Sequence, residues 1–166
     1  MIHSRSIKDI KKIIIHCSDS DWGSVAEIDR WHVARGFDMI GYHYVITNGC
    51  VAYNDAYDPD YDGMTRQGRR LDQVGAHCRG ENYDSIGICL IGRHHFTARQ
   101  LCQSLPDLLC SLFDIKTLTS IDQIYGHADF NPHKTCPNIN TRTLRQMPPV
   151  AYGKSKHFNK GGKCRS

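Results

Sequence analysis

Two stretches of the chain are apolar without a break, and they restrict the fold more than any other feature. Residues 12–16 place Ile13, Ile14 and Ile15 in succession, and residues 85–92 are apolar on both alternating faces. A strand with two apolar faces is buried on both sides, which is typical of a sheet interior covered by helices. The sequence therefore predicts interior strands at 12–16 and 85–92.

Helix signals lie between and after these strands. The capping box Ser24-Val-Ala-Glu27 predicts a helix that begins there and ends at Gly36. A second capping box, Thr97-Ala-Arg-Gln100, predicts a helix running towards Lys116. Pro106 lies inside that second helix and should kink or divide it, because proline lacks the N–H that the helix needs.

Weaker signals complete the pattern. Asn48-Gly49 is the strongest short hairpin signal, and it predicts pairing between Tyr42–Thr47 and Cys50–Asn54. Further predicted elements are a long surface loop at 55–72, strands at Val74–Cys78 and Ile121–Tyr125, and a short helix at Thr141–Gln146. Strands and helices that interleave around a hairpin predict a single α/β domain, with a central mixed sheet flanked by helices.

The positive charge is concentrated at the end of the chain. The 166 residues are 40% hydrophobic and carry a net charge of +4, as in an ordinary globular domain. Residues 151–166 hold five Lys or Arg and no acid, so the rest of the chain carries −1. A nearly neutral body argues against direct nucleic-acid binding. We place one domain at 1–147 and predict a basic, disordered tail at 148–166.

Neither a leader nor a membrane span is predicted. The longest early apolar run, 13–15, is far too short for a signal-peptide core or a membrane-spanning helix. We therefore expect a cytoplasmic protein without membrane insertion, whose eight cysteines are mostly reduced. Four cysteines lie in apolar stretches, as small buried side chains do: Cys17, Cys89, Cys102 and Cys110.

Three side chains suggest a metal site. His16 ends the first strand, where sites of α/β proteins tend to form, although a lone histidine is more often structural. The proline-stiffened segment 125–137 adds His127 and Cys136, with His133 as a reserve ligand. Two imidazoles, one thiolate and a water make a catalytic zinc site. From spacing alone, a loop with a buried cysteine and solvated histidines is about equally compatible.

Three more side chains are candidates for chemistry or binding. Lys134, two residues before Cys136, could stabilise an oxyanion, whereas most lysines are simply solvated. Tyr42 could donate or accept a proton, although a half-buried strand tyrosine is the commoner role. His77 ends a predicted strand and could hydrogen-bond a substrate.

Four segments together resemble a known family. They are IIIHCSDS at 13–20, GYHYVITNG at 41–49, GAHCRGENYDSIGICLIG at 75–92 and GHADFNPHKTCP at 126–137. In this order they resemble the type 2 N-acetylmuramoyl-L-alanine amidases, which share a fold with the peptidoglycan recognition proteins. The chain looks closest to the small phage amidases that are called lysozymes for historical reasons.

The resemblance implies roles for particular residues. It makes His16, His127 and Cys136 the ligands of one Zn²⁺ per chain. It places Tyr42 and Lys134 on the two catalytic side chains, and His77 near the substrate cleft. It also implies a surface groove over the metal. Two features depart from the family pattern: Pro106 within a helix, and the long, partly acidic loop 55–72.

The implied function is zinc-dependent hydrolysis of the amide between N-acetylmuramic acid and L-alanine in peptidoglycan, by a phage endolysin acting in host lysis. The alternative is a peptidoglycan-binding module of the same fold. Such relatives typically replace the third ligand, whereas Cys136 is present here. We expect a monomer that acts on the wall from the host cytoplasm after membrane permeabilisation. A protein regulator is possible and is not identified by the sequence.

Overall fold

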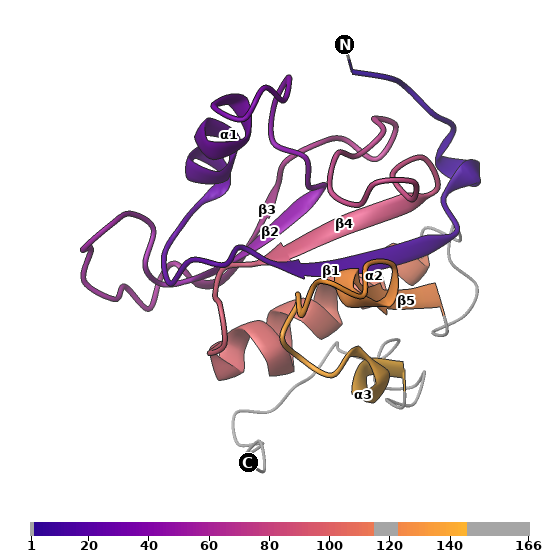
Figure 1. Cartoon of the computed structure of the whole chain (residues 1–166). Helices are drawn as coiled ribbons and strands as arrows, with labels where there is room; N and C mark the ends of the chain where they lie inside the picture. Colours follow the sequence, from indigo (N-terminus) through magenta and orange to yellow (C-terminus); the bar gives the residue numbers. More distant parts are fainter. Residues whose placement is uncertain (1, 115–122, 146–166) are drawn as a thin grey trace.

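A five-stranded mixed sheet forms the centre of the protein (Figure 1). The computed structural model describes residues 2–114 and 123–145. The strand order is β3-β2-β4-β1-β5, in which β2 and β3 are antiparallel and all other neighbours are parallel. The strands are β1 (Lys12–Cys17), β2 (Tyr44–Asn48), β3 (Asp62–Gln67), β4 (Ser85–Leu90) and β5 (Ile124–Gly126).

The two continuous apolar runs form the middle of this sheet, as predicted. In β4 every residue is buried, and in β1 every residue after Lys12 is buried. Their parallel register pairs Ile13 with Ile86 and Ile15 with Ile88. Both strands have neighbours on each side, so neither side chains nor backbone amides face solvent there.

Helices cover both faces of the sheet (Figure 1). α1 (Val25–Val33) packs on one face through Ile28, which contacts a small core with Val45 and Ile91. α2 (Leu105–Asp114) covers the other face, where most of the buried aliphatic side chains gather. α3 (Thr141–Arg145) adds Leu144 to that larger core. The predicted α/β class is therefore confirmed.

Both predicted helix starts are confirmed by their hydrogen bonds. The Ser24 hydroxyl accepts from the Glu27 amide at 3.2 Å. At the second start, the Thr97 hydroxyl accepts from the Gln100 amide, and the Gln100 side chain accepts from the Thr97 amide. The irregularity predicted at Pro106 takes the form of a π-helical segment, Gln100–Ser104, directly before α2. A π-helical segment is a local break in the α-helical hydrogen-bond pattern, and a proline favours such a break because it has no N–H to donate.

The predicted hairpin at Asn48-Gly49 is wrong. β2 pairs instead with β3, which lies inside the segment 55–72 that we predicted to be loop. The Gly49 carbonyl accepts from the Asp58 amide, and the Cys50 carbonyl accepts from the Gly23 amide. These contacts turn residues 50–58 away from β2, so its edge is left to β3. A local turn signal was overridden by pairing between residues farther apart.

The strand predicted at Val74–Cys78 is also absent. This segment is an irregular connection whose backbone bonds go to other loops, with the Val74 amide donating to His3 and the Ala76 amide to Gly41. The predicted strand at 121–125 is observed as Ile124–Gly126; residues 121–122 lie outside the described part.

The predicted tail, 148–166, and the predicted helix end at residue 146 also lie outside the described residues. Within the described ranges, no helix combines the length and apolar character required to cross a membrane.

Candidate metal centre and active site

Strand pairing brings the first two candidate ligands together. His16 lies near the end of β1, and its side chain projects from the face opposite to Ile13 and Ile15, on the α1 side. β5 pairs with β1 so that Gly126 lies opposite Ile15. His127 follows Gly126 directly, and the two imidazole rings have centroids 4.7 Å apart.

A closed loop brings the third candidate ligand to the same place. The Ala128 amide donates to the Cys136 carbonyl at 2.9 Å, which returns the chain to the end of β5. A Cβ at Gly126 would lie 2.8 Å from the Pro137 ring, so the absence of a side chain at this position permits the close approach. The Cys17 amide donates to the Cys136 sulfur at 3.2 Å and helps to fix it.

The three donor atoms have the spacing of a metal site. The ligand atoms of His16, His127 and Cys136 all lie within 4.8 Å of one another. His16 Nδ1 and Cys136 Sγ are 3.9 Å apart. Tetrahedral zinc with ordinary Zn–N and Zn–S lengths would separate two such atoms by about 3.6 Å. Two nitrogens and one sulfur therefore fit zinc with small adjustment and leave one position open.

Burial keeps the two candidate histidine ligands neutral, as metal binding requires. Burial lowers the pKa of His16 well below its usual value, with smaller effects from His127 and His32, so a neutral ring is favoured. Among the protein groups alone, the hydrogen bond with Cys17 and burial raise the pKa of Cys136. A bound divalent cation reverses this effect, because coordination deprotonates a thiol outright.

Within residues 2–114 and 123–145 the cysteines are mostly reduced, as predicted. Free thiols are found at Cys17, Cys50, Cys78, Cys89, Cys110 and Cys136. Cys102 is an exception and is disulfide-bonded. Our prediction treated it as a buried apolar side chain, whereas it lies exposed on the π-helical segment.

A groove of about 540 Å³ is lined by two of the candidate ligands, His127 and Cys136, with His16 buried next to them. Tyr42 and His77 line it from the sheet side, and His133 and Lys134 line it from the loop that follows β5. His133, the reserve ligand, is exposed and lies outside the three-residue cluster. Five of the six predicted site residues therefore line this groove, and the sixth, His16, is buried next to His127 and Cys136.

Tyr42 and Lys134 differ in their surroundings. The Tyr42 ring lies 5.1 Å from the His16 ring, between centroids, and burial raises the pKa of its phenol well above the ordinary value. Tyr42 is therefore a protonated donor at neutral pH. Lys134 is exposed at the groove wall, and its charge contributes, after burial, to the lowered pKa of His127. Lys134 is thus an exposed cation close to the ligands.

Both ring nitrogens of His77 contact other side chains of the protein. It is 9% exposed, and its Nδ1 lies 3.0 Å from His16 Nε2. Its Nε2 lies 3.4 Å from the Ser85 hydroxyl.

A second cation of the groove was missed in the sequence analysis. Arg35, just after α1, lines the wall together with His32 and Phe37. Its position near a helix end gave no signal by itself, because cations are common there for reasons of helix stability.

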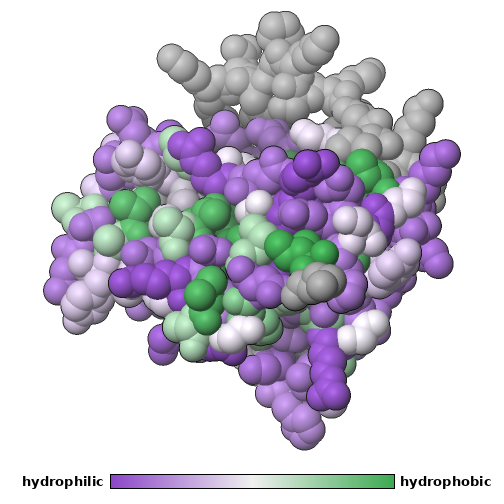
Figure 2. All heavy atoms as spheres, turned by 90° about the horizontal axis from the view of Figure 1, so that it is seen from above, coloured by the Kyte–Doolittle hydropathy of each residue, from purple (hydrophilic) through white to green (hydrophobic). Residues whose placement is uncertain are grey.

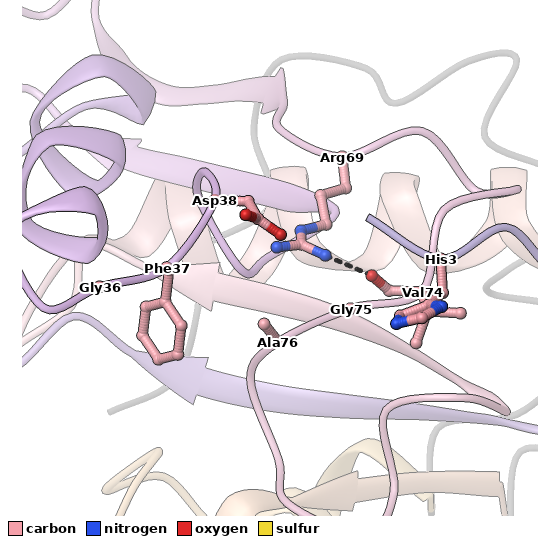
Figure 3. Close-up of a pocket in the computed structure, with 8 residues that line it drawn as sticks. All are labelled: His3, Gly36, Phe37, Asp38, Arg69, Val74, Gly75 and Ala76. Carbon is pink, nitrogen blue, oxygen red and sulfur yellow. Dashed lines mark hydrogen bonds between the residues drawn. The ribbon is translucent and has the colours of Figure 1, made fainter. Parts of the chain in front are cut away.

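A smaller pocket of about 300 Å³ shares Phe37 and Ala76 with the groove (Figure 3). In this pocket the Arg69 guanidinium donates to the Val74 carbonyl, and the Asp38 carboxylate points towards Arg69. The surrounding face, on the α1 side of the sheet, is mostly hydrophilic, with hydrophobic side chains in small groups (Figure 2).

Comparison with known proteins places this site in a family. The family described as N-acetylmuramoyl-L-alanine amidase matches residues 6–139. The chain belongs to this amidase family. The expected family, fold class and enzyme class are therefore confirmed.

Relatives of this amidase include phage endolysins. The endolysin of Escherichia phage T7 is 35% identical over 141 residues, which cover 78% of this chain and 82% of the relative. The endolysin of Klebsiella phage KP32 is 31% identical over 147 residues, covering 81% and 85%. A solved structure, the amidase LysC from Clostridium intestinale, superposes with a TM-score of 0.67 at 24% identity, covering 85% of this chain and 87% of LysC.

Proposed function

We propose that the protein is a zinc-dependent endolysin that hydrolyses the amide between N-acetylmuramic acid and L-alanine in bacterial peptidoglycan. The observation that carries the proposal is the cluster of His16, His127 and Cys136, two of which line a groove together with Tyr42 and Lys134. Amide hydrolysis at neutral pH requires an activated water and stabilisation of a developing oxyanion, and these residues can supply both.

The donor set favours zinc over other common ions. Imidazole nitrogen and thiolate sulfur suit zinc, whereas magnesium and calcium prefer oxygen ligands. When bound, zinc supplies a Lewis acid and makes water nucleophilic at neutral pH. His16 and His127 would hold the ion through neutral nitrogens, and Cys136 through its thiolate.

The remaining site residues act on the substrate. The Lys134 ammonium stabilises the negative charge that develops on the attacked carbonyl oxygen. The Tyr42 phenol, protonated at neutral pH, orients the reacting groups by donating a hydrogen bond or assists in proton transfer. Lys134 lies on the loop side of the groove and Tyr42 on the sheet side, so the scissile amide would be bound between them.

The alternative is a module of the same fold that binds peptidoglycan without cutting it. The presence of Cys136 beside both histidines favours the enzyme, because a binding module does not need a complete set of metal ligands. The biological setting we propose is host lysis, with a monomer that reaches the wall from the host cytoplasm once the membrane is permeabilised. The nearly neutral body argues against direct nucleic-acid binding.

Zinc content and cleavage should be measured together. We expect about one zinc per chain, loss of peptidoglycan clearing on chelation, and recovery when zinc is added back. New L-alanine amino termini would identify the bond. Zinc binding without cleavage would point to the binding module, and a folded protein that binds no zinc would refute the site.

A further inference from the structure

The hydrogen bonds behind His16 form a directed chain. Nδ1 of His16 is the nitrogen close to Cys136, and Nε2 of His16 faces His77 Nδ1 at 3.0 Å. The next link joins His77 Nε2 to the Ser85 hydroxyl at 3.4 Å. The Ser85 hydroxyl in turn donates to the Glu81 carbonyl at 2.5 Å.

Each proton in this chain can be assigned from its partners. If Nδ1 of His16 binds a metal, the His16 proton must be on Nε2, and it donates to His77 Nδ1. The His77 proton is then on Nε2 and donates to the Ser85 oxygen. That oxygen is free to accept, because its own proton is used on the Glu81 carbonyl. All the bonds are compatible with one set of tautomers.

The surroundings of the His77 ring are built to hold one orientation. A Cβ on Gly87 of β4 would lie 2.5 Å from His77 Cδ2, and so would a Cβ on Gly75. The ring therefore occupies space that only glycines on both sides leave open. Its backbone is fixed as well, because the Asn82 side chain accepts from the amides of His77 and Cys78 at 2.8 and 2.9 Å.

We propose that His77, supported by Ser85, is a positioning residue that fixes the tautomer and ring orientation of His16 for metal binding. The inference rests on the proposed zinc site and deepens it. Histidines that bind a metal commonly donate their second N–H to an acceptor that orients the ring, and loss of that acceptor costs roughly 10–100-fold in metal affinity. Here the acceptor is another neutral imidazole.

This role replaces substrate binding by His77. A neutral imidazole offers one donor and one acceptor, and the protein uses both. A hydrogen bond to substrate would require breaking the bond to His16 or the bond to Ser85. His77 therefore lines the groove with ring carbons, while its nitrogens serve the metal ligand.

Zinc affinity, measured by competition with a chelator in the absence of substrate, tests the proposal directly. We expect His77→Leu to weaken zinc binding by roughly 10–100-fold. His77→Asn should recover much of this loss, because its amide oxygen can accept from His16 near the former Nδ1 position. Ser85→Ala should weaken binding less than His77→Leu, since it removes the second link only.

Ser104→Ala is the matched control for the Ser85 variant. Ser104 is also a buried serine whose hydroxyl donates to a backbone carbonyl, that of Gly63, but it lies on the helical segment before α2. Zinc affinity should be unchanged in this variant. Equal losses in Ser85→Ala and Ser104→Ala would mean that general destabilisation is responsible, and would overturn the proposal.

Imidazole nitrogen NMR of the zinc-loaded wild type gives a second readout. A proton on Nε2 of His77 is expected, and a proton on Nδ1 would overturn the assignment. If His77→Leu keeps wild-type zinc affinity and only raises KM, His77 contacts substrate and this inference alone fails. If the wild type binds no zinc, the proposed function fails together with it.

Discussion

Lys134 is the site residue whose contribution can be isolated most cleanly, because it is exposed and lies outside the ligand cluster. Removing its side chain should leave folding and zinc content intact. Loss of one donor to a developing oxyanion commonly lowers the rate by about 10²–10³-fold, so we expect such a fall for Lys134→Ala, measured as release of L-alanine amino termini. Lys8→Ala, at another exposed lysine, should retain full activity. Retention of most activity by Lys134→Ala would refute its role as an oxyanion donor.

Gln100, in the π-helical segment before α2, links this segment to the middle of the sheet. Gln100 is fully buried, and its Nε2 donates to the carbonyls of Ile46 and Ile91, at 3.0 and 2.9 Å. Gln100→Ala removes both bonds, and an unsatisfied buried group costs about 1–3 kcal/mol, so the free energy of unfolding in urea should fall by about that amount. The exposed neighbour Gln103 provides the control, since Gln103→Ala should change stability by less than about 0.5 kcal/mol. Equal effects of the two substitutions would contradict this role.

Buried neutral histidines make the stability of the whole molecule sensitive to acid. Burial, followed by the charge of Arg5, lowers the pKa of His43 from 6.5 to about 3. Between these values the unfolded chain binds a proton that the folded chain does not, so stability is lost as pH falls from about 6.5. One such group contributes up to about 1.4 kcal/mol per pH unit. Urea unfolding at pH 7 and pH 5 should show the loss, and His43→Gln should reduce its slope. An unchanged slope would exclude His43 as a source.

The sequence predicted those parts of the fold that depend on nearby residues. The apolar runs of β1 and β4 must be buried, whichever strands pair with them. The caps at Ser24 and Thr97 depend only on residues within a single turn of helix. The position of β3 was missed, because the partner of β2 is selected by packing across the sheet and not by the turn signal at Asn48-Gly49.

The same division holds for the site. Residue type and family resemblance were enough to propose His16, His127 and Cys136 as zinc ligands, because few side chains bind zinc. The hydrogen-bond partners of His77 came only from the tertiary structure, because the resemblance placed this residue near the substrate cleft without naming its contacts. Its ring is turned to His16 by an irregular connection and by glycines at positions 75 and 87. The chemistry of a ligand is a property of its side chain, whereas the direction of a hydrogen bond depends on every group that surrounds it.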